Sequence, residues 1–151
     1  MFRFVEDDLK DKNVTIEYIR ELENRLNISF PDILVEWYTH HNKAKIAECA
    51  FSIYHLDFSV EFIIPLCYGT VTVEKILAHN RGDEYFPKTF IPLAEEVDGE
   101  DFFWDSVSGK VYYLSMGNVE NPIPVCDSVE RFFSILTQSC LNTSTIEENP
   151  K

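Results

Sequence analysis

The sequence predicts an α+β fold, in which a mainly antiparallel sheet packs against an N-terminal helix pair and a C-terminal helix. Apolar residues recur at helical spacing near both ends of the chain, which predicts helices there. Residues 90–114 instead alternate short apolar runs with an acidic stretch and a glycine turn, the pattern of a strand meander. The chain has 151 residues, a length that suits one domain.

Two helices are expected near the N-terminus. Residues 1–13 mix apolar and acidic side chains, and we interpret them as a helical lead-in. The first well-defined helix follows Thr15, a hydroxyl residue of the kind that caps helices, and Asn27 tolerates the left-handed conformation that closes one. A second helix is expected from Pro31, which a helix accepts at its start, to Asn42.

The middle of the chain predicts two strands and a short helix. One strand is expected at residues 51–55, where apolar and polar side chains alternate. Another is expected at residues 62–66, with an edge or a bulge at Pro65. Thr72 precedes an apolar pattern that ends near Asn80, which predicts a short capped helix.

Residues 90–114 are the most informative stretch. Five acidic side chains lie between residues 95 and 101, and we interpret them as a loop between strands. Ser108 and Gly109 suit a tight hairpin turn, and the residues after them are β-branched and aromatic, as strands prefer. The expected strands of this meander are residues 90–93, 102–105 and 111–114.

The chain is expected to finish with a short strand at residues 123–126 and a helix. Asp127, with Glu130 three residues later, has the pattern of a capping box at the start of that helix. We place a single domain at residues 1–141 and interpret the polar residues 142–151 as a disordered tail. The apolar face of the helix consists of Val129, Phe132, Phe133, Leu136 and Cys140.

The net charge of the chain limits the kinds of molecule that it is expected to bind. The chain has 13 Lys and Arg residues against 26 Asp and Glu residues, a formal net charge of −13. Nucleic-acid binding depends on basic clusters that neutralise phosphates, so this balance argues against it. A basic protein would be attracted, although acidity can also serve solubility alone.

The cysteines and the N-terminus indicate a compartment. Cys49, Cys67, Cys126 and Cys140 form no C-x-x-C pair and lack the spacing of a zinc site, so we expect four buried, reduced thiols. Charges interrupt the N-terminal residues, which lack the apolar core of a signal peptide. No apolar run reaches the ~20 residues that span a bilayer. These features favour the cytoplasm.

Three segments, in this order, resemble the SUKH superfamily, which includes Smi/Knr-type bacterial immunity proteins and fungal cell-wall regulators. They are the opening IEYIRELENRLNISFPDILVEWYTHHN, the core FIPLAEEVDGEDFFWDSVSGKVYYL and the closing IPVCDSVERFFSIL. One departure is Lys43-Ala44, where the family has Gly-Gly after Asn42, and residues 44–69 match no specific pattern. The resemblance implies an α+β domain that binds a protein, in bacteria usually a secreted toxin and often a nuclease.

The residue pattern does not indicate catalysis. No cysteine is next to a histidine, and a G-x-S-x-G motif is absent. His40 and His41 suit the end of a helix, where positive charge is favourable. We therefore expect a protein without enzymatic activity, cofactor or metal. The acidic loop remains open to three interpretations: a solvated loop, a surface that recognises a partner, or a Ca²⁺ or Mg²⁺ site.

Charge and resemblance together favour an immunity protein that neutralises a cognate, basic toxin by direct binding, with neither a nucleic acid nor a membrane as partner. The runner-up is a regulatory scaffold domain of the Smi/Knr type, and a metal-dependent enzyme is third. Tryptophans are more often core residues, yet aromatic side chains beside carboxylates are typical interface anchors. The expected contact residues are Glu95, Glu96, Asp98, Glu100, Asp101, Trp104, Trp37 and Tyr38.

Overall fold

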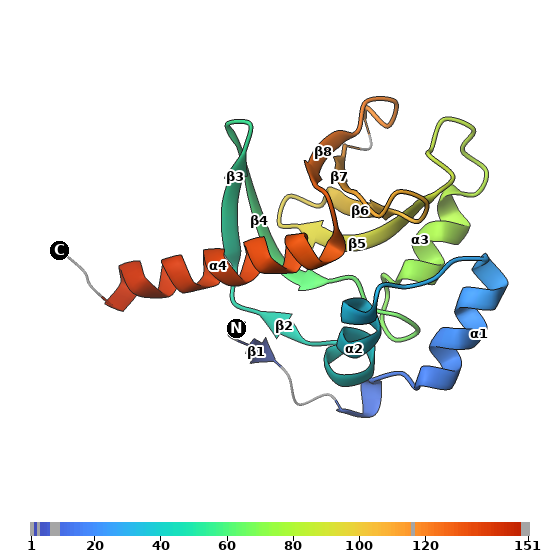
Figure 1. Cartoon of the computed structure of the whole chain (residues 1–151), viewed down its shortest axis with the longest axis horizontal. Helices are drawn as coiled ribbons and strands as arrows, with labels where there is room; N and C mark the ends of the chain where they lie inside the picture. The colour runs from blue at the N-terminus through green and yellow to red at the C-terminus, as the bar shows by residue number, and fades with distance from the viewer. Residues whose placement is uncertain (1, 3, 7–9, 116, 149–151) are drawn as a thin grey trace.

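A computed structural model describes residues 2, 4–6, 10–115 and 117–148 (Figure 1). The side chains of residues 5, 6, 10 and 140–148 lie outside that description. The elements confirm the predicted α+β class, because a six-stranded antiparallel sheet is combined with an N-terminal helix pair and a C-terminal helix. The strands of this sheet are β3 (Cys49–Ile53), β4 (Leu56–Ile63), β5 (Phe90–Glu96), β6 (Asp101–Asp105), β7 (Val111–Leu114) and β8 (Ile123–Cys126). The helices are α1 (Ile16–Leu26), α2 (Asp32–His41), α3 (Val73–Asn80) and α4 (Val129–Glu148).

Each strand of the main sheet pairs with its neighbour in the sequence, in the order β3-β4-β5-β6-β7-β8. The predicted meander is therefore confirmed as β5, β6 and β7. Phe102 and Trp104 on β6 belong to one apolar cluster and Phe103 to another, since successive side chains of a strand point to opposite faces. Phe132 of α4 belongs to the first cluster, whereas Ile76 of α3 packs against both clusters.

The predicted helices form because their ends carry suitable capping residues. The Thr15 hydroxyl accepts a hydrogen bond from a backbone N–H of α1 at 3.1 Å, and Asn27 ends that helix with a φ of 57°. Pro31 directly precedes α2, where its missing N–H is not needed. Thr72 caps α3 as Thr15 caps α1.

The buried side chain of Asn42 joins the end of α2 to the segment after β4. Its Nδ2 donates to the carbonyl oxygens of Lys12 at 2.9 Å and Leu66 at 2.7 Å, and its Oδ1 accepts from the N–H of Leu66 at 2.9 Å. A buried amide with these partners holds the two segments in a fixed relation. The segment after β4 that Asn42 holds borders the candidate site.

The N-terminus corrects the prediction of a helical lead-in. Strand β1 (Phe4–Glu6) pairs antiparallel with β2 (Lys45–Ile46) in a separate two-stranded sheet, and a short 3₁₀ helix, η1 (Lys10–Lys12), follows. The other residues of the expected lead-in lie outside the described part of the chain. Pairing with distant residues makes this segment a strand, and local periodicity does not reveal such pairing.

The β3–β4 hairpin also differs from the prediction, and it projects from the sheet in Figure 1. Strand β4 ends before Pro65 rather than continuing to residue 66, because proline has no N–H to donate to a neighbouring strand. Tyr54 and His55 form the turn, with φ values of 54° and 65°. Two successive positive φ values define a type I′ turn, which usually carries Asn-Gly, so the usual sequence signal was missing.

Helix α4 begins with a different cap from the expected one. The hydroxyl of Ser128, rather than Asp127, lies at the cap and accepts a hydrogen bond from the N–H of Arg131 at 3.0 Å. The helix continues to Glu148, so the residues expected to form a tail are helical up to that point. The domain boundary at residue 141 stays a prediction. In the described residues, no helix is both long enough and apolar enough to cross a bilayer.

The cysteines correct the expectation of four buried, reduced thiols. Cys49 is disulfide-bonded. Cys67 is free and exposed, whereas Cys126 is free and half-buried. Burial raises the pKa of the Cys126 thiol to about 11, which leaves little of the reactive thiolate at neutral pH.

Candidate protein-binding site

The structure divides the acidic stretch between two strands and a short turn. Strand β5 continues through Glu95 to Glu96 instead of ending at residue 93, and Asp101 is the first residue of β6. Pro92 lies within β5, and an irregularity in the pairing follows it. The predicted acidic loop is therefore reduced to the turn at residues 97–100.

Glu95 and Asp101 are directly opposite each other in the pairing of β5 with β6. Phe62 of β4 is opposite Glu95 on its other side. Opposed residues of antiparallel strands point to the same face, with Cβ atoms about 4.5–5.5 Å apart. The three side chains form a row across three strands, and all three are half-buried. We call Glu95 and Asp101 the acidic pair.

The acidic pair is electrostatically unfavourable in the isolated protein. Burial raises the pKa of Glu95. Burial, together with the charges of Glu95 and Glu100, raises the pKa of Asp101 to about 7. Among the described residues, no Lys, Arg or His lies within ion-pair distance of either carboxyl group. A cation supplied from outside would therefore favour the ionised form of both groups.

Glu96 has a structural role next to the acidic pair. Its side chain is only 5% exposed, and its carboxylate accepts hydrogen bonds from the N–H groups of Ser59 at 3.2 Å and Asp98 at 3.0 Å. These bonds tie the turn between β5 and β6 to β4. Asp98 lies exposed in that turn, and Glu100 is half-buried.

Trp104, Trp37 and Tyr38 lie in the core, with exposures of 2%, 5% and 0%. Trp104 and Tyr38 both pack on Phe30, and Trp37 packs on Phe133. Within the described residues, neither indole N–H nor the Tyr38 hydroxyl has a hydrogen-bond partner. Their burial favours a role in the core, since an interface anchor has to be reachable, and the expectation that these residues contact a partner stays a prediction.

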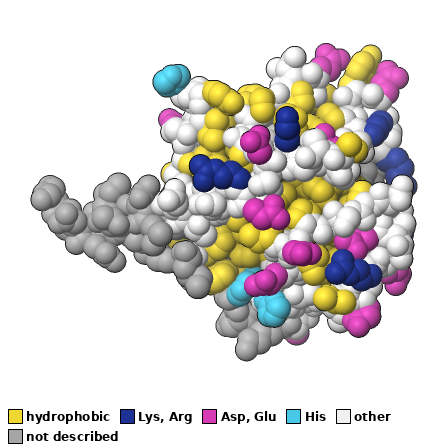
Figure 2. All heavy atoms as spheres, in the orientation of Figure 1, with side chains coloured by type: hydrophobic (Ala, Val, Ile, Leu, Met, Phe, Trp, Pro, Cys, Tyr) yellow, Lys and Arg dark blue, Asp and Glu magenta, His cyan; other side chains and the backbone are white. Residues whose placement is uncertain are grey.

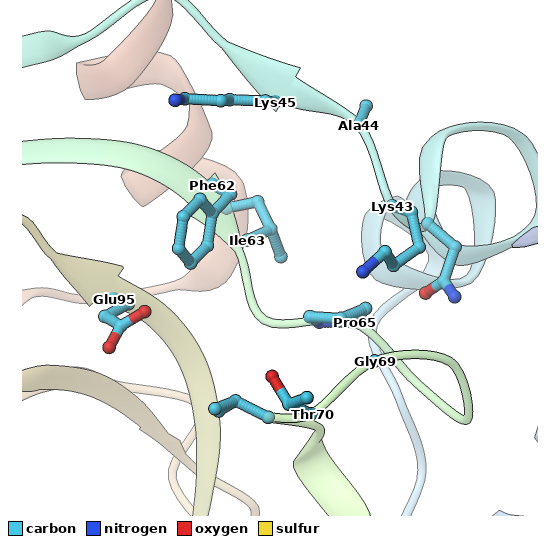
Figure 3. A pocket seen from close by; sticks show the side chains of 11 residues that line it. Lys43, Ala44, Lys45, Phe62, Ile63, Pro65, Gly69, Thr70 and Glu95 are labelled. Carbon is cyan, nitrogen blue, oxygen red and sulfur yellow. The ribbon is translucent and has the colours of Figure 1, made fainter. Parts of the chain in front are cut away.

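A hollow of about 350 Å³ is lined in part by Glu95 of the acidic pair (Figure 3). Figure 3 shows Glu95 and the ring of Phe62 on one side and Lys43 on the opposite side. The hollow mixes apolar and charged groups, which is how protein interfaces combine area with orientation. Its lining includes Lys43, Lys45, Phe62, Pro65, Val71 and Glu95.

Two smaller hollows continue the first. One shares Phe62 and Glu95 with it and adds Val97, and the other shares Val71 with it and reaches Asp101. Val71 and Val97 are 45% and 47% exposed. Figure 2 shows hydrophobic side chains reaching the surface in the middle of one face, with Asp and Glu side chains among them. We call the combined surface of Phe62, Val71, Glu95, Val97 and Asp101 the acidic trough.

The loop before α3 forms one wall of the trough and is fixed in place. The Glu74 carboxylate accepts the N–H of Cys67 at 3.0 and 3.1 Å. Gly69 has a φ of +128°, and a Cβ there would lie 3.2 Å from Lys43 Nζ, so this position requires glycine. The wall is therefore organised before any partner arrives.

The sequence pattern indicates the acidic residues of the site but not the apolar residues that lie beside them in the fold. Phe62 was expected in a strand, and only the pairing of β4 with β5 places it beside Glu95. Val71 and Lys43 belong to loops without a motif. In the part of the chain that the structure describes, no three His, Cys, Asp or Glu side chains are grouped so that they could hold a metal ion.

The antiparallel meander, its helices and the concave surface define a small α+β domain with an acidic candidate recognition site. The model of the SMI1 / KNR4 family (SUKH-1) matches residues 13–135. This match spans most of the chain, and the protein belongs to that family. The resemblance carried by the three sequence segments is therefore confirmed. A search among curated proteins found no match.

Proposed function

We propose that the protein is an immunity protein, which binds a cognate secreted toxin in the cytoplasm of the producing cell and neutralises it without chemistry of its own. Membership of the SUKH-1 family supports this role. We place the toxin-binding site at the acidic pair because its two opposed, half-buried carboxyl groups form no ion pair with a described residue. A basic toxin would supply the missing charge.

The overall charge supports the same class of partner. A net charge of −13 attracts a basic protein over a distance and raises its association rate. The apolar side chains of Phe62, Val71 and Val97 add contact area beside the carboxylates. Charge and apolar area then act together, the first on encounter and the second on the lifetime of the complex.

The proposed contacts divide into a centre and a rim. Glu95 and Asp101 form the centre, because they are partly buried before binding. Asp98 and Glu100 lie in or beside the turn and form the rim. Removing a rim charge changes the association rate, whereas removing a desolvated charge at the centre also changes dissociation.

A protection assay tests this function. The candidates to test are toxins encoded by neighbouring genes, and cells that produce the cognate toxin should survive when the wild-type protein is present. Glu95→Lys/Asp101→Lys should abolish protection. The control, Glu17→Lys/Glu21→Lys, makes the same change of charge at exposed positions of α1 and should protect normally. Thermal unfolding checks that both variants are folded.

The assay distinguishes an error in the proposed contact surface from an error in the proposed function. Full protection by both double variants would show that the toxin contacts another surface. Absence of protection by the wild-type protein, against a toxin that is active and expressed, would contradict the immunity function itself.

A further inference from the structure

We propose that the acidic trough holds one arginine side chain of the partner protein, with the guanidinium against the acidic pair and the aliphatic stem along Phe62. This inference rests on the proposed function for the kind of partner, and it deepens that function by naming the group that the trough accepts. The lining, the charge and the geometry of the trough each contribute to the argument.

The lining suits a side chain with a long apolar stem. Phe62 lies beside Glu95 in the row across the strands, and its ring lines the hollow on the same side as Glu95 (Figure 3). Val71 borders the same space and is 45% exposed. Long basic side chains cover apolar surface with their stems while their charged ends reach polar groups. A short polar side chain could not cover Phe62 and reach the carboxylates at once.

The carboxyl groups of the trough would be stabilised by a cation from another molecule. Three lysines line its hollows: Lys43, Lys45 and Lys75. Lys45 Nζ lies 3.7 Å from the Glu61 carboxylate, and Lys75 Nζ donates to the carbonyl oxygen of Gly69 at 2.9 Å. Lys43 lies across the hollow from Glu95 (Figure 3). Among the described residues, none of these three lysines lies within ion-pair distance of the acidic pair. Phosphate and nucleic acid would be repelled by the same two carboxylates.

The geometry favours arginine over lysine. Glu95 and Asp101 are opposite each other on adjacent strands, so a ligand between them has to serve two carboxylates. A guanidinium presents five N–H donors in a planar fork and can donate to both, and its flat face can also stack on an aromatic ring such as that of Phe62. An ammonium group is a compact, strongly hydrated charge without that fork.

The test uses the whole protein and a small probe, and it needs no toxin. Labelled protein is titrated with N-acetyl-arginine methylamide while amide NMR spectra are recorded. The matched probe is N-acetyl-citrulline methylamide, which has a similar stem and shape but no charge. The arginine probe should shift the signals of Phe62, Glu95 and Asp101 saturably and bind about tenfold more tightly than the citrulline probe.

Two variants sharpen the test. Asp101→Asn should weaken binding of the arginine probe about tenfold and leave the citrulline probe unaffected. Glu21→Gln, which removes an exposed charge on α1, should change the affinity less than about twofold. The spectra themselves show whether each variant is folded.

Three results would overturn the proposal: equal binding of both probes, shifts centred away from the trough, or equal weakening by Glu21→Gln and Asp101→Asn. Because the titration contains no toxin, its failure would leave the protection assay to decide the immunity function. Intact arginine binding without protection would instead reject the immunity function and leave the arginine site in place.

Discussion

Glu95 on β5 and Asp101 on β6 are opposed across the strand pair, so two carboxyl groups share one partly buried environment. No lysine of the described residues forms an ion pair with either carboxyl group. A folded protein retains such an arrangement at some cost in stability, and binding of a cationic group would remove that cost. The predictions below test the arrangement, the fold that holds it and the partner that it fits.

Replacing Asp101 by Asn should stabilise the protein at alkaline pH. The folded protein holds a proton on Asp101 up to a pKa of about 7, above the ordinary value of 3.8, so this group favours the folded state below pH 4 and loses that effect as pH rises toward 7. Glu95, Glu100, Lys75 and His79 lie near it or line the same hollow. The partly exposed side chain limits the gain to about 1 kcal/mol at pH 8.

Urea unfolding at pH 5 and pH 8 measures this effect. The difference between Asp101→Asn and wild type should be larger at pH 8, while Asp98→Asn, in the exposed turn, should show no such dependence. A constant difference at both pH values would contradict the raised pKa.

Glu96→Ala should destabilise the fold, in contrast to Glu95→Ala. The Glu96 carboxylate satisfies the N–H groups of Ser59 and Asp98, and its removal should lower the free energy of unfolding by about 2 kcal/mol. Glu95→Ala removes an unpaired acid and should stay within about 0.5 kcal/mol of wild type or rise above it. Chemical denaturation compares the two, and equal losses would show that Glu96 is not structural.

The hairpin turn should accept a stabilising substitution. Tyr54 and His55 both adopt positive φ, which Asn and Gly tolerate at lower cost. Tyr54→Asn/His55→Gly should raise the free energy of unfolding by about 1 kcal/mol, with each single change giving part of the gain. Thermal melting measures this effect, and a lower melting temperature would mean that the tip packs in a way that the φ values do not reveal.

The two free thiols should react at very different rates. Cys67 is exposed, whereas Cys126 is half-buried with a pKa raised to about 11, and only the thiolate attacks a disulfide reagent. At pH 8, native protein should label first at Cys67 and far more slowly at Cys126. Mass spectrometry of labelled peptides identifies the sites. Cys67→Ser removes the fast phase if the assignment is correct.

The sequence predicted most elements because their signals are local. Thr15, Thr72 and Asn27 act through groups within one helical turn, and capping of that kind is readable from short patterns. Strand β1 was missed because its partner β2 is distant in the chain. The hairpin was misplaced because Tyr54 and His55 lack the usual turn residues.

The candidate site could be predicted only in part. The acidic stretch was visible, but the pairing of β5 with β6 decides that Glu95 and Asp101 face each other and that Glu96 turns to the backbone of β4. Composition carries no information about register. The burial of Trp104 likewise could not be predicted from its neighbours in the sequence, since a tryptophan beside carboxylates is typical of either a core residue or an interface anchor.

The central claim is that a basic toxin docks on the acidic pair, and association kinetics across a salt series test it most directly. With a toxin that the wild-type protein binds, Glu95→Lys/Asp101→Lys should slow association at least about tenfold at low salt and flatten its salt dependence. Glu17→Lys/Glu21→Lys, with the same net charge, should change the rate less than about threefold. Equal rates for the two double variants at every salt concentration, with both proteins folded, would contradict this account.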